Sequence, residues 1–176
     1  DGPGDARNKG FLNSHEKFLA FLDSDDIWPE NYLEIRKKII LENNFEFISS
    51  DTIIYDDLSK TGYLRSCNKE KLNFNEFRRG NPIATSATII SRKLMQNIGG
   101  FSNIKKRNDF ATWLKASKVS PCYYITGVKP VYIIKKRNSL SSNKISLLKY
   151  NFFAFREIGM NRLNSCIYTL ITGVYS

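Results

Sequence analysis

The chain has 176 residues, of which 41% are hydrophobic and 13% aromatic, which excludes a disordered chain and favours one globular domain. The 27 lysines and arginines outnumber the 17 acidic residues, and the net charge of +10 suits nucleic acid, lipid headgroups or a small anionic substrate alike. Three widely spaced cysteines exclude a disulfide framework and a zinc site and fit a reducing compartment. No signal peptide is recognisable, and no apolar run approaches the roughly 20 residues of a membrane span.

The first predicted elements are a helix and a buried strand. The helix is predicted from Ala6 to about Ser14, with Gly4 or Asp5 as its cap and Arg7 in its first turn. The strand, Phe18–Leu22, is a continuous apolar run, which is typical of a central parallel strand covered on both faces. A central strand needs a neighbour on each side, and the short stretch before it has no strand pattern. We therefore expect the chain to be N-terminally incomplete.

Two carboxylates follow the strand directly. Asp23 and Asp25 are two residues apart, and if the strand continues that far, both leave it on the same side. Such a pair at the carboxyl edge of a sheet suits Mn²⁺ or Mg²⁺ shared with a diphosphate. The alternative is an acidic loop that caps the next helix, which is the commoner role for an isolated pair of acids. Pro29 is predicted at the first position of that helix, 29–43.

The rest of the chain alternates between strands and helices, which predicts an α/β fold. Strands are predicted at 45–55, 61–64, 84–90, 122–126 and 130–134, and helices at 74–79, 91–98 and from 109. Two amphipathic helices follow, around Leu148–Phe155 and Ile167–Val174; both are too short to span a bilayer, so we expect them to pack on the domain or to lie in the plane of an anionic membrane. Nucleic-acid binding is not expected, because the aromatic residues fall on predicted buried faces rather than in a basic stripe.

Three segments together resemble family 2 glycosyltransferases of the A-type nucleotide-sugar fold. They are ARNKG followed by FLAFLDSDDIWPENYLE, then NPIATSATIISRKLMQNIGGF, and NDFATWLK. The resemblance implies an incomplete A-type catalytic domain over residues 1–140, with a Rossmann-like mixed sheet flanked by helices, and a helical tail over residues 141–176. It also implies that two preceding βα units, about 60–80 residues, are missing.

The resemblance also implies roles for individual residues. Arg7 would contact the nucleotide, Asp23 and Asp25 would hold nucleotide and metal, and Asp109 would deprotonate the acceptor hydroxyl. The sugar and acceptor pocket would be shaped by Thr85, Ser86 and Trp113. Asp109 has a structural alternative as well, because acids at helix starts complement the helix dipole.

Two positions depart from the family pattern. Asn108 stands where the family usually has Glu, so a charge beside the expected base is lost. Lys136 stands in the place of a His that precedes a Ser-Leu-Ser segment in many members, so a third metal ligand is lost, and Lys136 or Arg137 could pair with phosphate instead.

The implied function is inverting, metal-dependent transfer of a sugar from a nucleotide-diphosphate donor, such as a UDP-sugar, to a glycan or lipid-linked acceptor in bacterial surface polysaccharide or lipopolysaccharide synthesis. The implied location is the cytoplasm, with peripheral contact to the inner face of the membrane. The alternative is an inactive remnant or an accessory module of the same fold that binds a glycan or a membrane.

Overall fold

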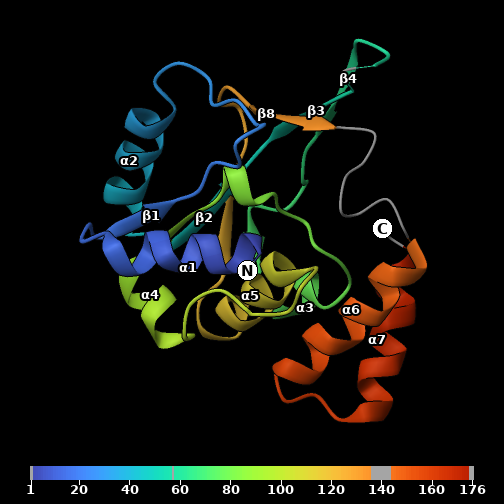
Figure 1. Ribbon diagram of the computed structural model, residues 1–176. Helices are drawn as coiled ribbons and strands as arrows, with labels where there is room; N and C mark the ends of the chain where they lie inside the picture. Colours follow the sequence, from blue (N-terminus) through green and yellow to red (C-terminus); the bar gives the residue numbers. More distant parts are fainter. Residues whose placement is uncertain (1, 57, 136–143, 175–176) are drawn as a thin grey trace.

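The computed structural model describes residues 2–56, 58–135 and 144–174 and has two mixed sheets (Figure 1). The larger sheet has the order β1-β6-β2-β7-β5, in which β2 and β7 are parallel and the other pairs antiparallel. The smaller sheet has the order β4-β3-β8, in which β3 and β8 are parallel. The strands are β1 (Phe18–Ala20), β2 (Phe47–Ser50), β3 (Thr52–Asp56), β4 (Thr61–Arg65), β5 (Lys71–Leu72), β6 (Ile89–Ser91), β7 (Cys122–Ile125) and β8 (Val131–Lys135).

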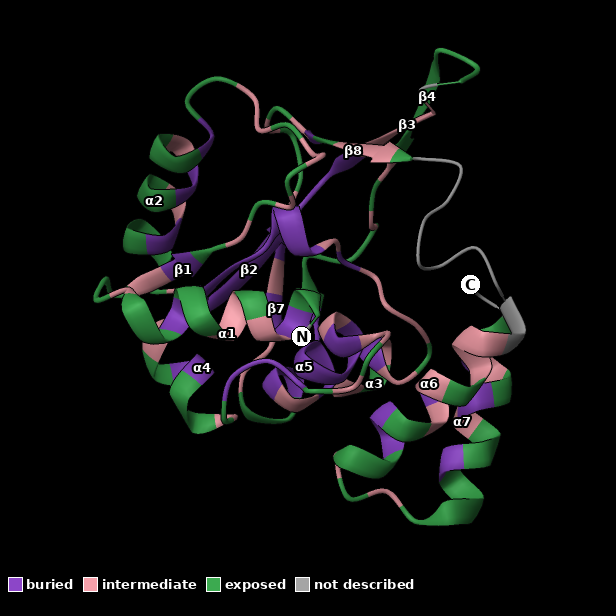
Figure 2. Cartoon of the chain, in the orientation of Figure 1, coloured by how far each residue is buried: buried purple, intermediate pink, exposed green. Residues whose placement is uncertain are grey.

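Helices cover both faces of the larger sheet (Figures 1 and 2). One face carries α2 (Tyr32–Asn43), and the other carries α1 (Pro3–Asn13), α4 (Arg92–Asn97) and α5 (Asn108–Val119), with the short α3 (Phe74–Phe77) against α5. The tail is a helical hairpin in which α6 (Lys144–Glu157) packs on α5 and α7 (Arg162–Val174) packs on α6. None of the helices described here is long and apolar enough to cross a bilayer.

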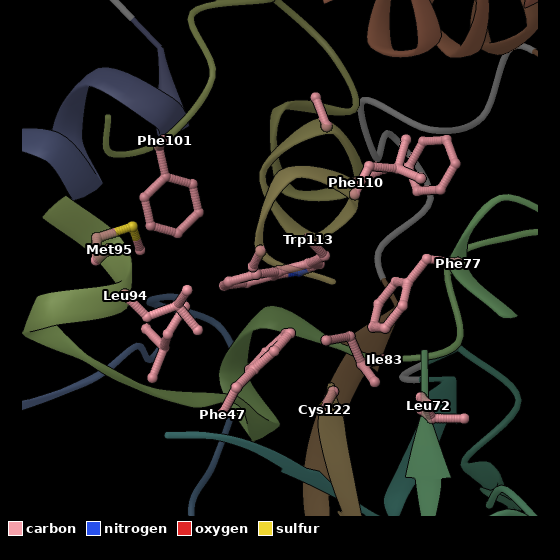
Figure 3. Close-up of a cluster of buried hydrophobic side chains, with 14 of the residues drawn as sticks. Phe47, Leu72, Phe77, Ile83, Leu94, Met95, Phe101, Phe110, Trp113 and Cys122 are labelled. Carbon is pink, nitrogen blue, oxygen red and sulfur yellow. The ribbon is translucent and has the colours of Figure 1, made fainter. Parts of the chain in front are cut away.

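The main hydrophobic core lies between α5 and the larger sheet and is centred on Trp113 (Figure 3). The Trp113 ring lies 5.5 Å from the rings of both Phe47 and Phe101. The tail shares this core, because Phe155 of α6 packs edge-to-face on Phe110 with ring centroids 5.6 Å apart. A second core cluster joins α2 to the opposite face of the sheet. The predicted α/β fold is therefore confirmed, with a mixed sheet between two layers of helices.

The predicted central parallel strand over Phe18–Leu22 is wrong. In the structure β1 ends at Ala20, pairs antiparallel with β6 and stands at one end of the described sheet. Phe21 instead turns inward and packs edge-to-face on Phe101 at 4.9 Å, while Leu22 is exposed. The apolar run therefore consists of a short strand followed by one side chain, Phe21, that packs in the core. Hydrophobic periodicity alone does not distinguish this arrangement from a longer buried strand.

Tertiary contacts also override three other predicted boundaries. Pro29 does not begin α2. Ile27 exchanges two backbone hydrogen bonds with Tyr132 of β8, and the Tyr32 N–H donates to the Pro29 carbonyl in a turn, so the helix begins at Tyr32, after Asn31 in a left-handed conformation. The strand predicted at 45–55 is divided at Asp51 between the two sheets. The strand predicted at 84–90 is shortened to β6, which follows the 3₁₀ turn η1 (Thr85–Ala87).

Candidate active site

A pocket of about 450 Å³ opens where the loop after β1, the η1 turn and the start of α5 meet. Its lining includes three carboxylates, Asp23, Asp26 and Asp109, and four cationic side chains, Arg7, Arg65, Lys106 and Arg107. Two other hollows of similar volume lie around Arg92, and neither has more than one carboxylate in its lining. The pocket after β1 is therefore the place where charged groups converge.

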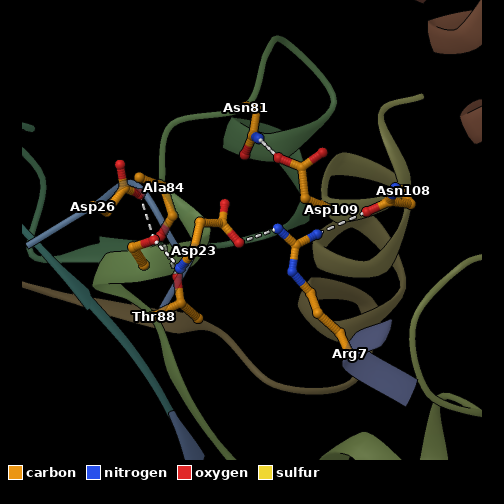
Figure 4. Close-up of polar contacts among 9 residues, drawn as sticks. Arg7, Asp23, Asp26, Asn81, Ala84, Thr88, Asn108 and Asp109 are labelled. Atoms are coloured by element: carbon orange, nitrogen blue, oxygen red, sulfur yellow. Dashed lines mark hydrogen bonds and ion pairs between the residues drawn. The ribbon is translucent and has the colours of Figure 1, made fainter. Parts of the chain in front are cut away.

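Arg7 joins the two sides of this pocket (Figure 4). From α1 its guanidinium donates one hydrogen bond to Asp23 Oδ1 at 2.5 Å and another to Asn108 Oδ1 at 3.0 Å. The Arg7 side chain is only 14% exposed. Because Asn108 is neutral, Asp23 is the partner that balances the charge of Arg7 in this bridge. The guanidinium thereby fixes the turn after β1 relative to the first turn of α5.

The turn after β1 brings Asp23 and Asp26 together. Since β1 ends at Ala20, strand alternation does not reach the acids; the Asp26 N–H instead donates to the Asp23 carbonyl at 3.0 Å and closes a tight turn. Asp23 and Asp26 line the pocket, whereas Asp25 is not among its lining residues. Asp26 was not predicted from the sequence, although its three-residue spacing from Asp23, typical of a turn, is a signal for it.

Ser86 holds this turn in place. Its hydroxyl accepts a hydrogen bond from the Asp23 N–H at 3.0 Å and donates one to Asp26 Oδ2 at 2.5 Å, and its carbonyl accepts one from Trp28 Nε1 at 2.7 Å. Thr85 and Ser86 both line the pocket, at the positions where the sequence predicted a substrate pocket. The Ser86 hydroxyl is thus engaged with the acidic turn, and Thr85 lies beside it.

Asp26 is the carboxylate whose protonation is most perturbed here. Burial raises the pKa of Asp26, and hydrogen bonds from Ser86 and from the Ile134 N–H lower it. The negative charges of Asp23 and Asp25 raise the pKa further, so the net shift is upward. The Asp26 carboxyl therefore favours its neutral form more than an exposed aspartate does.

Asp109 occupies the opposite wall of the pocket (Figure 4). It is the second residue of α5, after Arg107 in a left-handed conformation with φ 60°, and its Oδ2 accepts a hydrogen bond from Asn81 Nδ2 at 3.0 Å. Burial lowers the pKa of Arg107, and the charge of Asp109 opposes that shift. The structure thus brings Arg7, Asp23 and Asp109 to one pocket.

Trp113 does not line this pocket, although the family resemblance implied that it would help to shape the sugar and acceptor pocket. One turn after Asp109, its side chain is 0% exposed and lies in the aromatic core under α5. A direct contact with substrate therefore does not fit its position. Its Nε1 is buried without a hydrogen-bond partner in the described part of the chain, so packing alone holds the ring.

A divalent cation fits the donor set on the Asp23 side of the pocket. No group of three His, Cys, Asp or Glu side chains that could enclose a metal is found among the described residues. Asp23 is a hard oxygen donor whose side chain is 42% exposed at the pocket. Such a site suits Mg²⁺ or Mn²⁺, which take few protein ligands and complete their shell with water and phosphate oxygens.

Lys136 and the 140/141 boundary of the expected tail lie outside the described residues.

The Glycosyl transferase family 2 profile matches residues 1–99, which is more than half of the chain, so the chain belongs to this family. It is 29% identical over 159 residues to the teichuronic acid biosynthesis glycosyltransferase TuaG of Bacillus subtilis, covering 89% of this chain and 62% of TuaG. It is also 29% identical to the Escherichia coli glucosyltransferase WfgD over 173 residues, covering 96% of this chain and 66% of WfgD. The chain thus spans just under two thirds of these relatives.

The fold agrees with solved structures of S. aureus TarS. S. aureus TarS 1–349, solved in complex with UDP-GlcNAc, superimposes with a TM-score of 0.66 at 16% identity, covering 93% of this chain and 50% of that chain. TarS 1–349 without that ligand gives the same TM-score and covers 96% of this chain. The A-type glycosyltransferase fold expected from the sequence is therefore confirmed.

Proposed function

We propose that the protein transfers a sugar from a nucleotide-diphosphate donor to a hydroxyl of a glycan or lipid-linked acceptor. The observation that carries the proposal is the convergence of Asp23, Arg7 and Asp109 in one pocket. Relatives support the substrate class: WfgD is named as a UDP-Glc:alpha-D-GlcNAc-diphosphoundecaprenol beta-1,3-glucosyltransferase, and TuaG is named for teichuronic acid biosynthesis.

The donor diphosphate is assigned to the side of the pocket with Arg7 and Asp23. Arg7, Arg65, Lys106 and Arg107 give this pocket a surplus of positive charge over its three carboxylates, which suits a dianionic group. Mn²⁺ or Mg²⁺, when held by Asp23, the acid of the expected pair that lines the pocket, supplies neutralisation of the charge on the departing diphosphate. Arg7 would orient the Asp23 carboxylate and, in the presence of donor, contact the nucleotide.

The acceptor hydroxyl is assigned to the Asp109 side. Asp109 takes the hydroxyl proton while the acceptor oxygen forms a bond to the anomeric carbon and the bond from that carbon to the diphosphate oxygen breaks. One displacement from the face opposite the leaving group inverts the anomeric configuration. The hydrogen bond from Asn81 holds Asp109 Oδ2 and limits the rotation of the carboxylate.

A transfer assay tests this proposal. The purified protein is incubated with UDP-glucose or UDP-GlcNAc, Mn²⁺ and a synthetic lipid that carries α-GlcNAc diphosphate, and the anomeric configuration of the product is read by NMR. We expect metal-dependent transfer with inversion. Retention of configuration would refute the single displacement, and nucleotide binding without transfer would favour the accessory, non-catalytic module.

A further inference from the structure

The last helix of the tail, α7, has both exposed and buried residues along its length (Figure 2), and several of the buried ones are polar. Leu163, Ile167 and Leu170 recur at the spacing of one helical face, and they are 72%, 43% and 68% exposed. Three hydroxyl residues on the opposite side are buried: Ser165, Thr169 and Thr172. A helix whose outer side faces water has the reverse arrangement, with apolar residues toward the protein.

The inward side of α7 packs through small and polar residues beside one aromatic contact, Tyr168 on Phe155 of α6, with ring centroids 5.9 Å apart. Asn151 of α6 donates a hydrogen bond to Thr172 Oγ1 at 3.0 Å, and both side chains are buried. Gly173 allows close approach, because a Cβ there would lie 2.7 Å from Leu148 Cδ2. Small residues and interhelical hydrogen bonds are the features by which helices associate where lipid surrounds them, since apolar side chains then gain little by facing the protein.

The charge of the hairpin selects an anionic surface. Residues 144–174 contain four basic residues, Lys144, Lys149, Arg156 and Arg162, and one acidic residue, Glu157. Glu157 is already neutralised by Lys115 at 2.5 Å and accepts a hydrogen bond from Ser102 at 2.5 Å. The exposed apolar stripe of α7, which consists of Leu163, Ile167 and Leu170, is therefore accompanied by excess positive charge, and anionic lipid headgroups attract such charge.

A second copy of the chain fits this stripe less well. Three exposed apolar side chains fall far short of the roughly 800 Å² per partner that a stable interface buries. Two basic hairpins brought face to face would also repel each other.

We propose that α7 docks in the plane of an anionic bilayer, with Leu163, Ile167 and Leu170 in the boundary between headgroups and acyl chains. At 13 residues the helix is about 20 Å long, too short to cross a hydrocarbon core of about 30 Å, so it lies along the surface. The preceding helix, α6, carries Leu147 to the lining of the candidate active-site pocket. Docking through α7 would thus bring that pocket close to the membrane surface.

Vesicle flotation tests the proposal without any need for activity. The protein is mixed with phosphatidylcholine vesicles, with and without phosphatidylglycerol, and the bound fraction is measured against lipid concentration. The test variant is Leu163→Gln/Leu170→Gln, and the matched control is Leu12→Gln/Leu41→Gln, which changes two exposed leucines on α1 and α2. Circular dichroism confirms that each variant is folded.

We expect flotation with the anionic vesicles, a loss of about tenfold or more in lipid partitioning for the α7 variant, and no comparable loss for the control. Lys149→Gln/Arg162→Gln should reduce binding to anionic vesicles while leaving the apolar stripe intact. The proposal is overturned by absent flotation, by equal binding to neutral and anionic vesicles, or by equal binding of the α7 variant and the wild type. A lipid-free dimer that the α7 variant abolishes, without flotation, would assign the stripe to a second copy.

Discussion

Replacing Arg7 with methionine tests whether this residue organises the donor side of the pocket. The change keeps a long side chain but removes the two hydrogen bonds that join Asp23 to Asn108. Asp23 is then left partly buried without its cation, and the first turn of α5 loses its tie to the acidic turn.

The burial of the pair sets the size of the effect. Fully exposed ion pairs contribute about 0–1 kcal/mol, and removing one partner of a fully buried pair costs about 3–5 kcal/mol. Arg7 is 14% exposed and Asp23 is 42% exposed, so the pair lies between these limits. We expect a loss of about 1–3 kcal/mol in the free energy of unfolding, which at about 2–4 °C per kcal/mol lowers Tm by roughly 2–12 °C.

Thermal unfolding and UDP titration calorimetry measure the two consequences together. The matched control is Arg92→Met, because Arg92 likewise ties separate parts of the chain, through three side-chain hydrogen bonds to Glu16, Phe11 and Ser14, but does not line the pocket. Both variants should lose stability, whereas UDP affinity should fall by about 10-fold or more only for Arg7→Met, through loss of a charge-assisted hydrogen bond. Unchanged UDP affinity in Arg7→Met would refute a donor-side role and leave Arg7 as a structural tie.

Two further predictions concern the acidic turn. Mn²⁺ alone should bind weakly, because Arg7 already occupies Asp23 Oδ1 and a phosphate is needed to complete the coordination shell of the ion. Calorimetric titration should show tighter Mn²⁺ binding in the presence of UDP. Tight Mn²⁺ binding without UDP, or binding that is unchanged in Asp23→Asn/Asp25→Asn, would contradict the metal assignment. Because burial raises the pKa of Asp26 from its ordinary value of 3.8, the stability that this group contributes is present below that value and is lost as pH rises through the raised pKa. Asp26→Asn should therefore gain stability relative to the wild type as pH rises above 3.8 in urea unfolding, and a pH-independent difference would show that the carboxyl is unperturbed.

The two ends of α4 are determined by residues next to the helix in the sequence. Gly99 and Gly100 stop α4 because both adopt the left-handed region, with φ of +78° and +79°. Ser91 caps the same helix by accepting a hydrogen bond from Leu94 N–H at 3.1 Å. These interactions are made within a few residues of chain, so the sequence pattern predicts them.

Long-range contacts decide the features that the sequence did not predict. Ser86 reaches the acidic turn from 60 residues away and makes Asp26, rather than Asp25, line the pocket with Asp23. Trp113 was expected at the pocket from the family resemblance and lies one helical turn after Asp109, but the packing of α5 on the sheet turns it into the core. A spacing of one helical turn gives approximate direction, whereas the depth of each side chain depends on what covers the helix.

The most direct test of the proposed chemistry is Asp109→Asn in the full-length protein, with Tm, UDP affinity and sugar transfer measured on one preparation. Asparagine can still accept the hydrogen bond from Asn81, and loss of a helix cap or dipole partner costs about 1 kcal/mol. Glu34→Gln, in the first turn of α2, is the control for that structural effect. If Asp109 is the base, transfer falls by about 10²–10⁴-fold while UDP affinity is kept. Near-normal transfer with a lowered Tm would contradict the account and make Asp109 a structural cap.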